Sequence, residues 1–175
     1  MGQPNAADYS ALEQLRDGRK VEIRALRPDD RAALLSAVGR ASAESLYRRF
    51  FGVRGDFTER EIAFFLNVDF ASHVALVAIV EENGRPAIVG GGRYVVVQPG
   101  KAEVAFAVVD AYQGCGIGAA LMSHLAAIAR RAGLEELVAE VLPDNLPMLK
   151  VFEKTGLRLE TRREPRVVHV SLFLD

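Results

Sequence analysis

The order of apolar and polar positions along the chain predicts a mixed α/β domain. The segment KVEIRAL, residues 20–26, alternates with a period of two, which is typical of a half-buried strand. Residues 27–41 and 58–68 instead carry apolar positions at helical spacing, each after a helix-start signal. Between them, SAESLYRRFF (42–51) is interpreted as a further helix. The first part of the domain is therefore expected to be one strand followed by three helices.

Three β-rich segments follow at 73–82, 86–97 and 101–109, separated by the turn sequences ENGRP and QPG. Short turns of this kind connect neighbouring antiparallel strands, so a three-stranded meander is expected. The remaining predicted elements are a helix from about Gly116, a strand at 135–142, a helix at 143–156 and strands at 157–160 and 166–174.

Length and composition are those of one globular domain: 175 residues, 50% hydrophobic and 26% charged. We expect a loose amino-terminal lead at 1–19 and one domain at 20–175. With 22 basic and 23 acidic residues, the chain offers no electrostatic reason to bind nucleic acid or an anionic membrane. The first twenty residues are polar and mixed, so a signal peptide is not expected, and no apolar run approaches the roughly 20 residues that span a bilayer. The single cysteine, Cys115, fits a reducing compartment, so the expected location is the cytoplasm.

The segment DAYQGCGIGAAL, residues 110–121, places glycines between a strand and a helix. Amides at a helix start lack intrahelical partners and the helix dipole adds positive charge, so this turn can bind a phosphate. It is not a P-loop, because Gly118 is followed by Ala119 and Ala120 rather than Lys and Ser or Thr. A dinucleotide fingerprint is also excluded, because these glycines follow an antiparallel meander. The structural alternative is a tight strand-to-helix connection.

The order Q-x-x-G-x-G, here Gln113 to Gly118, resembles the GNAT superfamily of acyl-CoA-dependent N-acetyltransferases. The resemblance covers roughly 20–174, with its core at 102–157. It implies the GNAT α/β (α+β) fold: a mixed, mostly antiparallel sheet flanked by helices, with a splayed central strand pair formed by AEVAFAVV and ELVAEVL. VEIRALRPDD and SAESLYRRFF are in addition similar to the GNAT domain of bacterial protein-lysine acetyltransferases.

The resemblance also implies acetyl-CoA as co-substrate and no metal. Strand backbone would pair with its pantetheine arm, the glycine segment would cradle its pyrophosphate, and Asn145 would bond the pantetheine or serve only as a helix cap. The implied cofactor-binding residues are Phe106, Ala107, Val108, Gln113, Gly114, Cys115, Gly116, Ile117, Gly118, Ala119 and Asn145. The three histidines lie far apart in the sequence, without metal-ligand spacing.

Glu103 is the candidate general base. An amine is protonated at neutral pH and must lose a proton to attack a thioester, and a carboxylate can accept that proton. Alternation along the strand places Glu103 on one face with the small side chains of Ala105 and Ala107. The alternative is a solvated glutamate paired with Lys101 or Arg93.

Two positions depart from the family pattern. Phe152 stands where many members have a tyrosine that protonates the CoA thiolate, and Cys115 stands where a basic residue is common. We expect direct transfer of an acetyl group to a primary amine, with a strand N–H near Val108 polarising the thioester carbonyl. A protein lysine is the expected acceptor; a small amine or amino-acid derivative is the alternative. Because of Phe152, a non-catalytic acyl-CoA sensor also stays open. The expected assembly is a monomer or homodimer.

Overall fold

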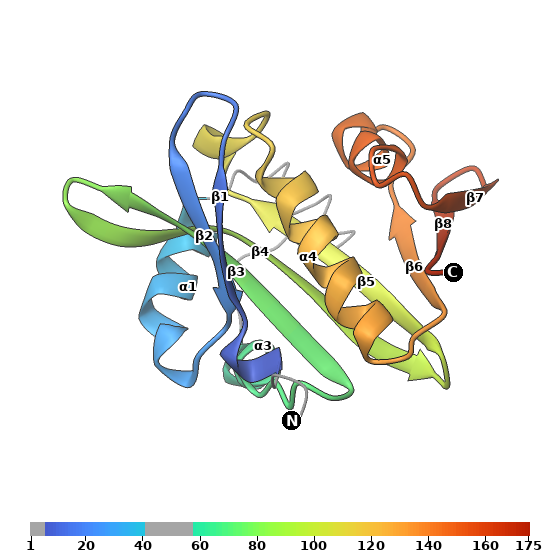
Figure 1. The fold of residues 1–175 in the computed structure, drawn as a ribbon, viewed down its shortest axis with the longest axis horizontal. Helices are drawn as coiled ribbons and strands as arrows, with labels where there is room; N and C mark the ends of the chain where they lie inside the picture. Colours follow the sequence, from blue (N-terminus) through green and yellow to red (C-terminus); the bar gives the residue numbers. More distant parts are fainter. Residues whose placement is uncertain (1–5, 41–57) are drawn as a thin grey trace.

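The computed structural model describes residues 6–40 and 58–175, and in these two segments eight strands form a single sheet in the order β1-β2-β3-β4-β5-β6-β8-β7 (Figure 1). The strands are Ser10–Gln14 (β1), Lys20–Ala25 (β2), His73–Glu82 (β3), Arg85–Gln98 (β4), Lys101–Val108 (β5), Glu136–Val141 (β6), Arg158–Arg163 (β7) and Val168–Phe173 (β8). The α-helices are Arg31–Gly39 (α1), Glu59–Leu66 (α3), Ile117–Arg131 (α4) and Leu146–Glu153 (α5). All neighbouring strands are antiparallel except β5 and β6.

Most elements lie where the periodicity placed them, and the meander of β3, β4 and β5 is confirmed. The helix expected at 27–41 begins as a short 3₁₀ turn, Pro28–Asp30, and continues as α1. The sequence predicted no strand before Lys20, yet β1 pairs along the whole of its length with β2. The helix expected at 42–51 lies outside the described residues.

Helices cover both faces of the sheet, as alternate residues of β4 show. A Cβ atom built on Gly92 would lie 3.1 Å from Leu125 of α4. The next residue, Arg93, donates from Nη1 to the carbonyl oxygen of Phe65 in α3 at 3.1 Å. Because successive strand residues point to opposite faces, α4 packs on one face and α3 on the other.

The parallel pair β5 and β6 is joined over only three positions: Lys101 with Glu136, Ala102 with Leu137, and Glu103 with Val138. Both strands continue beyond these pairs without facing each other, and Figure 1 shows them diverging. The predicted splayed strand pair is thereby confirmed. Beyond Glu103, the edge of β5 that faces β6 has no strand partner among the described residues.

Candidate active site

The glycine loop between β5 and α4 contains two glycines in the left-handed backbone conformation. Gly114 and Gly116 have φ angles of 79° and 99°, and Gly116 is the N-cap of α4. A Cβ on either residue would meet no heavy atom within 4 Å, so backbone conformation, not crowding, favours glycine there. At Gly118 a Cβ would lie 3.4 Å from Cγ2 of Val151 in α5, which is an ordinary van der Waals contact, so crowding does not require glycine at this position.

The first turn of α4 presents backbone amides to the space above the loop. The first hydrogen bond of the helix runs from the Ala120 N–H to the Gly116 carbonyl at 3.0 Å. The amides of residues 117–119 precede it and have no intrahelical acceptor, and no side chain in the described part of the chain caps this helix end. Together with the helix dipole, these amides can bind an anion.

Gln113 ties the loop to the end of β5. Its Nε2 donates to the Val108 carbonyl at 3.1 Å, and its own carbonyl accepts from Cys115 Sγ at 3.8 Å. The Gln113 side chain therefore has a structural role, which the sequence alone did not indicate. It fixes the loop relative to the strand edge.

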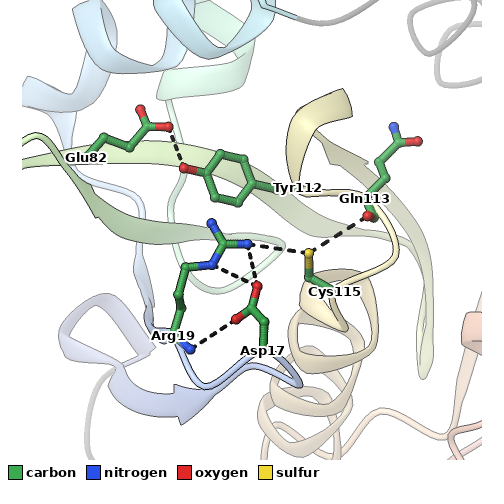
Figure 2. A network of polar contacts seen from close by, with 6 residues as sticks. All are labelled: Asp17, Arg19, Glu82, Tyr112, Gln113 and Cys115. Atoms are coloured by element: carbon green, nitrogen blue, oxygen red, sulfur yellow. Dashed lines mark hydrogen bonds and ion pairs between the residues drawn. The ribbon is translucent and has the colours of Figure 1, made fainter.

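A cleft of about 430 Å³ runs from the glycine loop along the free edge of β5. β6 and α5 form its other wall, and Glu103 lies on its lining with the predicted cofactor-binding residues other than Cys115. In the described part of the chain these lining residues are Phe106, Ala107, Val108, Gln113, Gly114, Gly116, Ile117, Gly118, Ala119 and Asn145. Cys115 is not among these lining residues, and its Sγ lies 3.7 Å from Nη2 of Arg19 (Figure 2).

Asn145 caps α5. Its Oδ1 accepts from the Met148 N–H at 3.4 Å, which leaves the amide nitrogen of the side chain without a partner among the described residues. Because Asn145 also lines the cleft, the cap and a contact with a ligand are compatible.

Glu103 is exposed and forms no ion pair with any described residue. The two cations considered as its partners bind elsewhere. Lys101 Nζ lies 3.4 Å from Glu136 Oε2, and Arg93 donates to Phe65 and to Nε2 of His73 at 2.9 Å. The carboxylate of Glu103 is therefore available to accept a proton.

The face that carries Glu103 opens into an apolar part of the cleft. The apolar side chains in this part of the cleft belong to α1 and α3, so the sequence of β5 does not indicate them. These lining residues are Leu34, Leu35, Val38, Ile62 and Phe65. A cleft that is lined by these apolar residues and by a carboxylate can accommodate an aliphatic amine.

Two aromatic residues that line the cleft, Phe152 and Tyr112, make different contacts. Phe152 is 2% exposed and packs edge-on against Phe106 at a centroid distance of 6.2 Å, so it contributes packing but no proton. Tyr112 is buried, and its hydroxyl donates to Glu82. This hydrogen bond, together with burial, raises the pKa of Tyr112.

A glycine loop with free backbone amides lies here beside a parallel strand pair that separates. This is the arrangement of an acyl-CoA-dependent N-acyltransferase. Consistent with this class, the model of the acetyltransferase (GNAT) family matches residues 40–157, and the chain belongs to this family. Enzymes of the GNAT family use acetyl-CoA and acetylate amines, and the protein is accordingly an acetyltransferase.

Individual relatives agree with the family. Acetyltransferase PA5475 of Pseudomonas aeruginosa is 35% identical over 72% of this chain and 68% of its own length. Acetyltransferase Pat of Mycolicibacterium smegmatis is 35% identical over 82% of this chain, which spans only 43% of that protein. The crystal structure of the GNAT domain of S. lividans PAT is 33% identical, with a TM-score of 0.85 and 99% coverage of both chains.

The described residues, 6–40 and 58–175, lack a membrane-spanning helix and a cluster of metal-binding side chains. None of the helices there has both the length and the apolar character needed to cross a membrane. In the same segments, no group of three or more His, Cys, Asp or Glu side chains is placed to hold a metal ion.

Proposed function

We propose that this protein acetylates lysine side chains of other proteins, with Glu103 as the general base. The observation that carries the proposal is the position of Glu103. It is exposed and lies where β5 and β6 separate, on the same cleft as the glycine loop, without a cationic partner in the described chain.

The residues of the cleft fit acetyl-CoA. The loop offers amides and positive-φ glycines for the pyrophosphate, and the unpaired edge at Phe106, Ala107 and Val108 can hydrogen-bond the pantetheine as a strand would. Asn145 adds a side-chain amide on the opposite wall. When bound, acetyl-CoA supplies an activated acyl group as a thioester.

Glu103 then accepts, directly or through a water molecule, the proton that the attacking amine loses. The amine nitrogen bonds to the acyl carbon while the carbon–sulfur bond breaks, and an N–H of β5 near Val108 donates to the carbonyl oxygen. Phe152 has no proton to give the departing thiolate. A thiol pKa of about 8.5 makes the thiolate an adequate leaving group without a protein acid.

Two features favour a lysine over a small polar amine. Apart from Arg31, the residues of α1 and α3 that line the cleft are apolar, and they suit the four methylene groups of a lysine side chain, whose amine then reaches the carboxylate. The chain also resembles the GNAT domain of bacterial protein-lysine acetyltransferases in sequence, and it is similar to Acetyltransferase Pat and to the GNAT domain of S. lividans PAT.

The test is a thiol-release assay with acetyl-CoA, lysine-containing proteins and peptides, and a panel of small amines. We expect acceptor-dependent release with lysine acceptors, reduced roughly 10²-fold or more in Glu103→Gln. Binding of acetyl-CoA, measured by calorimetry, should stay unchanged. Glu81→Gln is the matched control, since Glu81 is an exposed strand glutamate outside the cleft. Preference for small amines would overturn the lysine acceptor, and full activity of Glu103→Gln would overturn the base.

A further inference from the structure

The turn between β1 and β2 lies against the glycine loop although the two are about a hundred residues apart in the sequence. The Leu15 N–H donates to the Arg19 carbonyl at 2.7 Å, and Gly18 has a φ angle of 90°, so the turn is tight. From this turn, Nη2 of Arg19 reaches to 3.7 Å from Sγ of Cys115, the residue between the two positive-φ glycines of the loop (Figure 2).

The guanidinium of Arg19 is held in place by its neighbours. Its Nε donates to Oδ2 of Asp17 at 2.8 Å, and its central carbon lies 4.8 Å above the ring of Tyr112. Tyr112 in turn donates to Glu82, whose carboxylate accepts two hydrogen bonds from Arg40 at 3.0 Å. These contacts hold Arg19 beside the loop without a ligand. The conformational entropy that Arg19 would lose when a ligand binds is therefore smaller.

A second arginine of the same turn, Arg16, lines the cleft. It is exposed and has no hydrogen-bond or ion-pair partner among residues 6–40 and 58–175. Two other arginines that line the cleft already have partners: Arg31 binds Glu59 at 3.0 Å, and Arg93 binds Phe65 and His73. Arg16 is thus a cation on the lining of the cleft that no described residue neutralises.

The loop itself contains no Lys or Arg from Gln113 to Ala119. Its attraction for an anion comes from amides and the helix dipole alone, which amount to about half a charge. CoA carries a pyrophosphate and a 3′-phosphate, so several negative charges have to be balanced at this end of the cleft. A guanidinium is well suited to this because it offers paired N–H donors to phosphate oxygens.

We infer that the β1–β2 turn is part of the donor site: Arg16 binds a phosphate group of CoA, and Arg19 positions the turn against the glycine loop and adds positive charge there. This inference rests on the proposed use of the cleft for acetyl-CoA. It assigns recognition of the phosphorylated end of the donor to an element that lies far from the loop in sequence.

Two lysines of α5, Lys150 and Lys154, also line the cleft, and Figure 1 shows α5 and the β1–β2 turn on opposite sides of α4. They are the competing candidates for the same phosphates. The turn is favoured because Arg19 contacts the glycine loop directly. The two assignments make different predictions and can be separated by substitution.

The experiment measures dissociation constants for CoA and dephospho-CoA by calorimetry, which needs neither an acceptor nor turnover. We expect Arg16→Ala to weaken CoA about tenfold, Arg16→Lys to weaken it less, and Arg16→Glu to weaken it more. Arg19→Ala should also weaken CoA, and in both alanine variants affinity should depend less steeply on salt than in the wild type. Thermal unfolding of each variant shows that the fold is retained.

Arg166→Ala is the matched control, since Arg166 is an exposed arginine outside the cleft with no described partner, and it should bind CoA as the wild type does. If the loss in Arg16→Ala disappears with dephospho-CoA, Arg16 binds the 3′-phosphate; if it persists, Arg16 binds the pyrophosphate. The inference is overturned if Arg16→Ala and Arg19→Ala bind CoA within twofold of the wild type, or if Lys150→Ala and Lys154→Ala alone lose affinity. Failure of lysine acetylation would leave these binding results unaffected.

Discussion

Glu103 and Val138 form the last pair of the parallel ladder between β5 and β6, and the two strands separate beyond them. Glu103 therefore lies at the point where β5 and β6 begin to separate. The glycine loop and residues of α1 and α3 line the same cleft as Glu103. Under the proposed function, donor and acceptor share the cleft that Glu103 lines, which is what direct transfer requires.

The glycine loop can be tested with two glycines of the same conformation at opposite ends of α4. Gly116 and Gly133 have φ angles of 99° and 84°, and a Cβ on either would meet no atom within 4 Å. Alanine at each should cost about 1–2 kcal/mol of unfolding free energy, because left-handed backbone is unfavourable with a side chain. Only Gly116→Ala should also weaken acetyl-CoA binding, by about tenfold, as measured by calorimetry. Equal affinities in the two variants would contradict the role of the loop.

The two roles of Asn145 can be separated by the choice of replacement. Asn145→Ala removes the helix cap and should cost about 1 kcal/mol of unfolding free energy in a denaturant titration. Asn145→Asp keeps an oxygen that can accept from the Met148 N–H, so it should preserve stability. It removes the amide N–H groups, and acetyl-CoA affinity should fall. If the aspartate variant binds acetyl-CoA normally, Asn145 is a cap and nothing more.

Gly92 allows the ring of Phe106 to pack beneath α4. A Cβ at this position would lie 2.6 Å from Cδ1 of Phe106 and 3.1 Å from Leu125, and both side chains are buried. Gly92→Ala should therefore destabilise the fold by about 1–3 kcal/mol, as expected for an overpacked core. In Gly91→Ala the new methyl group would be 3.4 Å from the Leu76 carbonyl, an ordinary contact, and the cost should be smaller. Chemical denaturation of the pair measures the difference.

His73 should make folding stability depend on pH. It is 6% exposed, and burial, followed by the nearby charge of Arg93, lowers the pKa of His73 to about 4 from an ordinary value of 6.5. Between these values the unfolded chain binds a proton that the folded protein does not, so stability is lost as the pH falls from about 6.5 to about 4. The unfolding temperature of the wild type should therefore fall more steeply over this interval than that of His73→Gln. Parallel curves for the two proteins would show that His73 does not contribute.

Local features of the chain were predictable because they depend on neighbours in sequence. The positive φ angles of Gly114 and Gly116 follow from a glycine turn that precedes a helix. The face on which Glu103 lies follows from the two-residue period of a strand. The cap at Asn145 follows from its place before an apolar helical segment.

Strand β1 was not predictable in the same way. Its sequence, SALEQ, shows no alternation of apolar and polar residues, and Leu12 is 75% exposed. The strand forms because backbone groups pair with β2 at the edge of the sheet, and backbone pairing depends little on side-chain identity. The order of apolar and polar residues in this segment therefore does not indicate a strand.

By itself, then, the sequence determined most of the elements, the place of the glycine loop between a strand and a helix, and the strand face of Glu103, since each is set by interactions over a few residues. Only the tertiary structure decided that Lys101 and Arg93 bind elsewhere, that α1 and α3 line the passage to Glu103, and that the turn with Arg16 and Arg19 meets the loop at Cys115. Such contacts join residues tens of positions apart. They depend on how the sheet brings its strands and helices together, and a one-dimensional pattern does not contain that information.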